Sequence, residues 1–197
     1  MCGRFCIDQD MWKELKQLLG ELDQMFSGWK WNRQGQDIYP TNQSLVITGR
    51  DGRLTPELQK WGFSNGHHSS TVINARAETA AGKRMFQDSV EHRRLVIPAA
   101  RFYEWNRDKQ KVTFYRKGQP ALYMAGIYRP GEEGWNFCIL TTEANDSMRS
   151  THSRMPLILE RREIEQWILD GASTAQILAE LPGALDKEAG YEQLSLF

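Results

Sequence analysis

The chain has 197 residues, a hydrophobic fraction of 40% and seven tryptophans, a composition typical of a globular protein rather than a disordered one. Its length suits a single domain, and no apolar run approaches the roughly 20 residues that a membrane-spanning helix needs. The formal net charge is zero, so the overall basic excess that marks many nucleic-acid-binding proteins is absent. Any contact with DNA therefore depends on a local patch of charge.

The cysteines Cys2, Cys6 and Cys138 are odd in number and sparse, which argues against a disulfide framework and indicates a reducing compartment. The first residues lack the basic stretch and long apolar run of a signal peptide, so we expect a cytoplasmic protein without a membrane partner. Cys2 and Cys6 with the histidines do not reproduce the spacing of a structural zinc site. We therefore expect neither a metal nor another cofactor.

The N-terminal part of the chain predicts one helix and then a hairpin. Asp8 is placed to cap a helix that Gly20 ends, and its apolar side chains recur at helical spacing: Met11, Trp12, Leu15, Leu18 and Leu19. Further along, Asp51-Gly52 suits the positive dihedral angles of a tight turn between a strand over 44–48 and a second strand after Gly52.

The middle of the chain is rich in β-branched and aromatic residues with polar, Gly or Pro breaks, which predicts strands over 94–98, 102–105, 112–115, 122–127 and 137–142. We expect a short helix over 80–88, two more over 160–169 and 174–181, and a tail from residue 183 to 197. No repeat or linker divides the chain. The prediction is a single α+β domain with a curved, largely antiparallel pseudo-barrel sheet and a few flanking helices.

One stretch of the chain concentrates positive charge: Lys83, Arg84, Arg93, Arg94, Arg101, Arg107, Lys109, Lys111, Arg116 and Lys117. It is a candidate patch for phosphate groups. On charge alone, a solvated basic face explains it equally well.

Cys2 offers a chemistry that Cys6 cannot. Aminopeptidases remove Met1 when a small residue follows, which leaves Cys2 with an exposed amine and thiol on adjacent carbons. An α-amine has a reference pKa near 7.7–8.0, so a useful fraction is neutral at pH 7, unlike a lysine amine near 10.4. A neutral amine forms a Schiff base with an aldehyde, and the thiol then closes a five-membered thiazolidine ring. The alternative is an incidental cysteine at position 2.

Three further segments hold polar groups that are candidates for chemistry. Asn74 and Arg76 end the run 72–73, Glu104 lies among three aromatic residues at 102–105, and His152 precedes Arg154 in the segment 151–156. Each has a simpler structural explanation: Asn74 as a helix cap, Glu104 on the exposed side of an edge strand, and His152 as a hydrogen-bonded loop residue.

Together with the N-terminus, these segments resemble the SRAP family (SOS response-associated peptidase, the abasic-site-processing proteins). The matching elements occur in the family's order and span residues 1 to about 160: MCGRF (1–5), WGF (61–63), NARAET (74–79), IPA (97–99), FYEW (102–105), AGIY (125–128), TTEAN (141–145) and HSRMP (152–156). The helical part over 160–182 contributes little to the resemblance.

The resemblance implies an active site of Cys2, Asn74, Glu104 and His152 that forms a covalent thiazolidine link to an abasic site in single-stranded DNA. Asn74 would hold the Cys2 backbone. Glu104, if buried, should have a raised pKa and act as a general acid on the sugar oxygen. His152 would move protons during sugar ring opening. Peptidase activity would be limited to removal of Met1, autocatalytic or aminopeptidase-assisted.

The resemblance also implies contacts with DNA. Arg4, Arg76 and Arg154 lie beside the proposed catalytic residues and are candidate phosphate ligands, since a guanidinium offers a fork of donors. Trp61 and Phe63 are candidates for stacking on unpaired bases. The expected partner is single-stranded DNA with abasic sites, bound at the nucleoid by a monomer.

The sequence departs from the family at two places. After Trp61-Gly62, family members usually continue through a Pro-x-Trp segment, whereas 64–70 here is shorter and polar. Arg101 replaces a glycine commonly found before the FYEW segment, which adds a positive charge.

Other activities also fit parts of the sequence. An N-terminal-nucleophile glutamine amidotransferase starts with Met-Cys-Gly and would use the Cys2 thiolate on an amide, but the segments around Asn74, Glu104 and His152 fit that class poorly. A cysteine peptidase acting on other proteins is a second alternative. A non-covalent binder of single-stranded DNA is a third.

Overall fold

The computed structural model describes residues 2–19, 35–64 and 71–190. Its helices are short and lie outside the sheets: α1 (Gln9–Leu19), α3 (Ala77–Ala80), α4 (Gln87–His92), α5 (Ile164–Leu169), α6 (Thr174–Leu178) and a 3₁₀ turn η1 (Arg161–Glu163). No helix in these ranges is long and apolar enough to span a membrane.

Five strands close into a barrel: β3 (Gln43–Arg50), β4 (Arg53–Trp61), β8 (Arg94–Ala99), β11 (Leu122–Gly131) and β12 (Gly134–Glu143). The ring runs β12-β4-β3-β8-β11 and returns to β12; only the β4–β12 pairing is parallel. Three short strands extend this sheet: β7 (Asn74–Arg76) parallel to β12, β13 (Arg154–Pro156) on β12, and β14 (Ile158–Leu159) on β11. The predicted fold class is confirmed.

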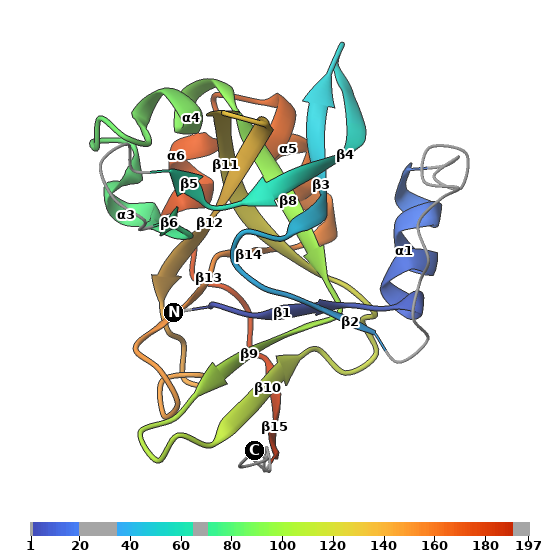
Figure 1. The fold of residues 1–197 in the computed structure, drawn as a ribbon, viewed down its shortest axis with the longest axis vertical. Helices are drawn as coiled ribbons and strands as arrows, with labels where there is room; N and C mark the ends of the chain where they lie inside the picture. The colour runs from blue at the N-terminus through green and yellow to red at the C-terminus, as the bar shows by residue number, and fades with distance from the viewer. Residues whose placement is uncertain (1, 20–34, 65–70, 191–197) are drawn as a thin grey trace.

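A second, five-stranded sheet lies across one end of the barrel (Figure 1). Its order is β15-β10-β9-β1-β2, all antiparallel, with β15 (Asp186–Gly190), β10 (Lys111–Tyr115), β9 (Arg101–Trp105), β1 (Phe5–Ile7) and β2 (Gln36–Ile38). A small hairpin pairs β5 (Phe63–Ser64) with β6 (Thr71–Val72). The chain passes from the barrel into the second sheet where β8 leads into β9.

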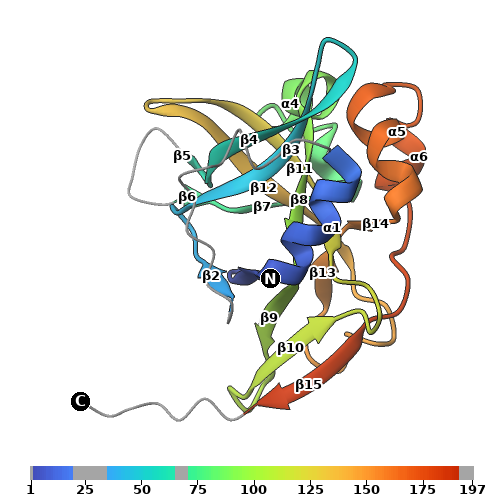
Figure 2. The same ribbon diagram turned by 90° about the vertical axis from the view of Figure 1, so that its right-hand side faces the viewer.

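The hydrophobic core fills the barrel and continues under the second sheet. In the barrel, the ring of Trp61 stacks on that of Phe137, and in the second sheet Phe102 stacks on Phe114. Helices α5 and α6 cover one side of the barrel (Figure 2), where Trp167 donates a hydrogen bond from Nε1 to the Leu95 carbonyl at 2.9 Å. The N-terminal residues Cys2, Phe5 and Ile7 pack within this core.

Several predicted elements are confirmed. Helix α1 buries Met11, Trp12 and Leu15, and the Asp8 side chain accepts a hydrogen bond from the Met11 amide at 3.0 Å, as an N-cap does. Its predicted stop, Gly20, lies outside the described residues. Strands β3 and β4 form the predicted hairpin, whose turn residues Asp51 and Gly52 have φ angles of 50° and 71°. All five predicted central strands are present.

The predicted helix over 80–88 is wrong. Helix α3 ends before Gly82, whose lack of a side chain disfavours a helix interior, and a turn bonded to the Lys83 carbonyl leads into α4. The helix expected over 160–169 begins as the turn η1, where Glu160 and Glu163 form a capping box. Helix α6 ends at Leu178 rather than 181, with Pro182 shortly after it.

The tail predicted from residue 183 is also corrected, because 186–190 form strand β15. Its residues are exposed and show no apolar alternation, so the sequence carries no strand signal. Backbone hydrogen bonds to the edge of β10 hold it in place. Residues 191–197 lie outside the described part of the chain.

Candidate functional site

Cys2 lies three positions before the start of β1, at the junction of the two sheets. Its carbonyl oxygen accepts a hydrogen bond from Asn74 Nδ2 at 3.0 Å, although 72 positions separate the two residues. Asn74 begins β7, and the parallel pairing with β12 places it opposite Ile139. The side chain of Asn74 therefore links the barrel to the N-terminal segment. Its Oδ1 is buried without a hydrogen-bond partner, so this amide has a second polar atom to offer.

The thiol of Cys2 is buried, with none of the residue's surface exposed, and this corrects the expected exposed thiol. Burial, and then the negative charge of Glu104, raise the pKa of the Cys2 thiol to about 12. Sγ lies 3.8 Å from the Arg4 carbonyl oxygen. With Met1 attached, the thiol is neutral at physiological pH.

Glu104 reaches the site from β9. The Tyr103 amide donates to the Arg4 carbonyl at 3.0 Å, which aligns β9 with the N-terminal segment. Glu104 is 5% exposed, so the expectation of a buried carboxyl is met, and the exposed edge-strand alternative is not. Its charge raises the pKa of the Cys2 thiol, and the antiparallel pairing of β1 with β9 directs Glu104 toward the N-terminal segment that carries Cys2.

His152 lies in the loop before β13, and both ribbon views place β13 beside the start of β1 (Figures 1 and 2). Its Nδ1 accepts a hydrogen bond from the Arg154 amide at 2.9 Å, and the Arg154 carbonyl oxygen is 3.2 Å from the same nitrogen. The backbone N–H can only donate, so the shorter contact favours the tautomer with its proton on Nε2. With the proton on Nε2, that nitrogen is a hydrogen-bond donor.

The guanidinium of Arg154 makes its hydrogen bonds within the protein. Its two terminal nitrogens bind both carboxylate oxygens of Glu78 on α3, at 2.5 and 2.9 Å, and one of them also donates to the Thr141 carbonyl at 2.6 Å. The Arg154 hydrogen bonds lower the pKa of the Glu78 carboxyl. Arg154 thus ties the His152 loop to the segment that follows Asn74.

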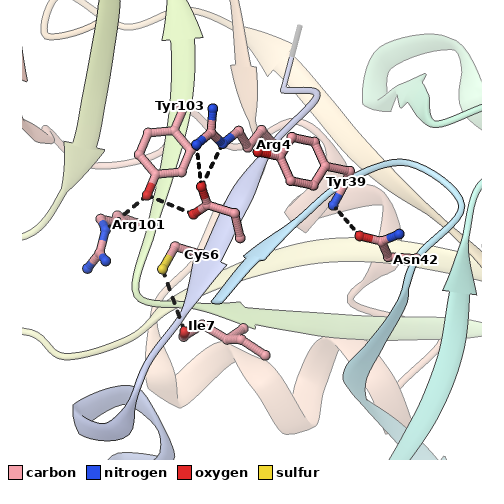
Figure 3. A network of polar contacts seen from close by, with 8 residues as sticks. Arg4, Cys6, Ile7, Tyr39, Asn42, Arg101 and Tyr103 are labelled. Atoms are coloured by element: carbon pink, nitrogen blue, oxygen red, sulfur yellow. Dashed lines mark hydrogen bonds and ion pairs between the residues drawn. The ribbon is translucent and has the colours of Figure 1, made fainter. Parts of the chain in front are cut away.

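Arg4 is also paired. Its guanidinium binds the Asp37 carboxylate, with Nε to Oδ2 at 2.7 Å, and it lies between the rings of Tyr39 and Tyr103, about 5 Å from each centroid (5.1 and 5.0 Å) (Figure 3). Tyr103 donates from its hydroxyl to Asp37 at 3.0 Å and accepts from Arg101 at 3.1 Å. The charge that Arg101 adds is therefore used in this network, together with an ion pair to Asp8 at 3.1 Å.

Arg76 is exposed, in contrast to Arg4 and Arg154. It lines an open cavity of about 390 Å³ that Asn74 and Lys83 also line. The cavity combines two long cationic side chains with the amide that binds Cys2. It can accept an anionic chain next to the N-terminus.

Two of the expected DNA contacts are contradicted. Trp61 and Phe63 are fully buried, so neither ring can stack on a base in this structure. Trp61 lies in the barrel core and donates from Nε1 to the Ile73 carbonyl at 3.0 Å, while Phe63 packs against Phe86. The segment 61–63 therefore contributes side chains to the hydrophobic core. The exposed aromatic residue beside Arg4 is Tyr39, which the sequence did not single out.

The basic stretch does not form one face. Arg94 is buried and donates to the Trp167 carbonyl at 2.6 Å, and Arg116 pairs with Glu160 at 2.7 Å. Among residues 2–19, 35–64 and 71–190, no group of three or more His, Cys, Asp or Glu side chains is arranged to hold a metal ion.

The profile of the SOS response associated peptidase (SRAP) family matches residues 1–193. The chain belongs to the SRAP family. The SRAP chain is 30% identical over 212 aligned positions to the abasic site processing protein YoaM of Bacillus subtilis, covering 100% of this chain and 92% of that one. It is 28% identical over 190 positions to YedK of Escherichia coli, which bears the same description, covering 91% and 86%.

Solved structures share the fold of this SRAP protein. A protein from Bacteroides thetaiotaomicron superposes with a TM-score of 0.78 at 21% identity, covering 95% of this chain and 91% of that one. A phage-related protein from Bordetella bronchiseptica gives 0.76 at 23% identity, covering 97% and 95%. These likenesses show that the chain shares its overall fold with these proteins.

Proposed function

We propose that this SRAP protein processes abasic sites in single-stranded DNA by a covalent bond through Cys2. The observation that carries the proposal is the hydrogen bond from Asn74 to the Cys2 carbonyl, beside the buried carboxyl of Glu104. If the amine and thiol of Cys2 react, we expect the protein to hold the backbone of this residue in place by a specific hydrogen bond. An incidental cysteine has no need of it.

The reaction needs removal of Met1, by an aminopeptidase or by the protein itself, which converts the amide nitrogen of Cys2 into an amine. That amine attacks C1 of the open sugar, and loss of one water gives an imine. The S–H group then adds across the C=N bond, so that sulfur bonds the carbon and the proton ends on nitrogen. The five-membered ring closes without an oxidant or reductant. The new ammonium group would also lower the pKa of the adjacent thiol, since an opposite charge favours the thiolate.

Glu104 and His152 supply proton transfer in this proposal. Glu104 donates to the oxygen that leaves the sugar carbon, and it assists the reverse step in which the carbon–sulfur bond reopens. His152 assists opening of the closed sugar, where a group that titrates near neutral pH is useful.

The DNA partner is a single strand held by a few phosphates. Arg76 and Lys83 are exposed along the cavity next to Asn74 and are placed to meet them. Arg4 and Arg154 reach a phosphate only by sharing or exchanging the carboxylates of Asp37 and Glu78. We further propose that the protein acts in the cytoplasm, at the nucleoid when it is bound to damaged DNA.

A denaturing gel tests the proposal. Processed protein mixed with abasic single-stranded DNA should give a shifted species that survives denaturation, and Cys2→Ala should abolish it. Cys6→Ala is the matched control, because that thiol is also buried but its nitrogen lies in a peptide bond. Equal adduct from Cys2→Ala would overturn the proposal.

The same preparations separate the other activities. Ammonia released from glutamine would indicate an amidotransferase, and cleavage of an added protein would indicate a general cysteine peptidase. A non-covalent binder would retain DNA on a native gel and show no shift after denaturation, with Cys2→Ser equal to the unsubstituted protein.

A further inference from the structure

Tyr39 is a large aromatic side chain left exposed at the edge of the site. It is 44% exposed, in contrast to the buried Trp61 and Phe63. It follows β2 directly, and β2 pairs with β1 so that Ile38 lies opposite Phe5. Tyr39 therefore lies next to the N-terminal segment that carries Cys2.

The turn that presents Tyr39 is rigid. The Asn42 amide donates to the Tyr39 carbonyl at 3.0 Å, with Pro40 second and Thr41 third in the turn. Thr41 has a φ of 73°, a left-handed conformation that is unfavourable for a β-branched residue and is usually taken by glycine in a type II turn. Strain of this kind persists only where the surroundings fix the backbone.

The surroundings of the turn do fix it. The Thr41 amide donates to the Trp61 carbonyl and the Trp61 amide donates to the Asn42 carbonyl, both at 2.9 Å. The Asn42 side chain accepts from the Tyr39 amide at 3.1 Å. The barrel thus holds the backbone of Tyr39 in one position.

The ring of Tyr39 is oriented as well. The Arg4 guanidinium lies over it at 5.1 Å from the centroid and 5.0 Å from the ring centroid of Tyr103 (Figure 3). The hydrogen bond from Arg4 Nε to the Asp37 carboxylate also holds the guanidinium in place. Arg4 is two positions from Cys2. A cation held against an aromatic ring restricts its rotation and leaves the exposed part of the ring for another planar group.

We propose that Tyr39 is the stacking platform for the base of the nucleotide next to the abasic sugar. The inference rests on the proposed function and names a residue that positions the substrate. A missing base leaves its neighbour without a stacking partner on one side, and every base offers a π face to an aromatic side chain. Stacking on Tyr39 would hold the strand with the open sugar at Cys2.

The test is a cycle of one protein substitution and one DNA change. Binding is measured for single strands with a tetrahydrofuran in place of the abasic sugar, which has no aldehyde and forms no covalent bond. The neighbouring base is present, or is removed on one side or the other. Tyr39→Ala should weaken binding about 5- to 100-fold when both neighbours are present. It should change binding by no more than about twofold when the stacked base is absent.

Tyr39→Phe keeps the ring and should retain the coupling. Trp135→Ala is the matched control, because Trp135 is 38% exposed but lies at the end of the β11–β12 hairpin, and it should show no coupling. Equal weakening of all DNAs by Tyr39→Ala, the result also expected of a misfolded variant, would overturn the inference. If the unsubstituted protein did not bind these DNAs at all, both the inference and the proposed function would be overturned. The two failures are therefore distinguishable, because only the second affects the unsubstituted protein.

Discussion

The chemistry that we propose at Cys2 involves a carboxyl group that the fold places inside the protein. Glu104 is buried on β9 and its charge raises the pKa of the Cys2 thiol, after the larger effect of burial itself. A carboxyl in this position has two effects on the reaction. It can donate a proton to a leaving oxygen, and in its charged form it disfavours the thiolate.

Glu104→Gln separates these two effects. The substitution removes a negative charge, so the pKa of the Cys2 thiol should fall and the thiolate should form at lower pH. It also removes the acid, so adduct formation and release should both slow by about 100-fold, the lower end of the usual contribution of a general acid. The measurement is the rate of formation, and of release into competitor DNA, as a function of pH. Unchanged rates would show that Glu104 is a structural strand residue.

His152 makes a different prediction, because its proposed role is to transfer protons while the closed sugar opens. If the protonated ring assists sugar opening, His152→Ala should slow adduct formation most at the acidic end of about pH 5 to 8. His92→Ala is the matched control, since that histidine is exposed on α4. A rate lowered equally at every pH would contradict proton transfer by His152.

At this scale the sequence predicted one contact between polar residues but not what surrounds it. Asn74 and Cys2 are in contact as the motifs indicated. The partners of Arg4 and Arg154 were not predicted, because Asp37 and Glu78 lie 33 and 76 positions away and no local pattern connects them. Trp61 was predicted to stack on a base, but it is buried where β4 pairs in parallel with β12. No sequence motif indicates that pairing.

At the scale of elements, the pair between Arg154 and Glu78 joins β13 to α3 across the site. The pKa of Glu78 is lowered in the folded state, so the pair contributes stability above the unfolded carboxyl pKa near 4.3, and this contribution is lost as the pH falls through the lower folded value. Glu78→Gln should lower the melting temperature at neutral pH, and its effect should decrease as the pH falls below the unfolded carboxyl pKa.

Thermal unfolding across that pH range is the measurement, with Glu180→Gln as a control because no ion pair of Glu180 is found in the described part of the chain. A difference between Glu78→Gln and the unsubstituted protein that is the same at every pH would mean that the pair adds nothing through its charge.

Elements with a clear residue periodicity or a turn dipeptide were predicted from the sequence, and the shortest elements were not. Helix α1 and the β3–β4 hairpin have helical spacing and a turn dipeptide as signals. Strands β1, β2 and β7 have three residues each, too few for an alternation to show. These short strands nevertheless position Cys2, Tyr39 and Asn74, whereas Glu104 lies on β9, which the sequence did predict.

For the whole molecule, the site forms where the barrel and the second sheet meet. Asn74, His152 and Arg154 come with strands of the barrel sheet, whereas Cys2 and Glu104 belong to the second sheet. The stability of the junction therefore affects the site as a whole, and buried ionisable groups within it respond to pH.

Cys138 provides a test of that response away from the proposed chemistry. Burial raises the pKa of its thiol above the ordinary value of 9.0, so the folded state keeps a proton that the unfolded state loses at high pH. Stability should therefore be unaffected below about pH 9 and fall above it, by up to about 1.4 kcal/mol per pH unit from this group. Cys138→Ala should reduce that slope.

Urea denaturation at pH 7, about 9 and about 10 measures the slope. Ile139→Val is the matched control, because it removes a methyl group from the next buried residue and should lower stability equally at each pH. An identical slope for Cys138→Ala and the unsubstituted protein would contradict a buried, protonated thiol.

The most direct test of the central claim is the intact mass of the protein–DNA adduct, with and without borohydride. For processed protein and abasic single-stranded DNA we expect the sum of the two masses less one water, without any reductant, because a thiazolidine is stable where an imine is not. Cys2→Ser keeps the amine and should give an adduct only when borohydride traps the imine. An adduct that Cys2→Ser forms equally well without borohydride, or one that maps to a residue other than Cys2, would contradict the account.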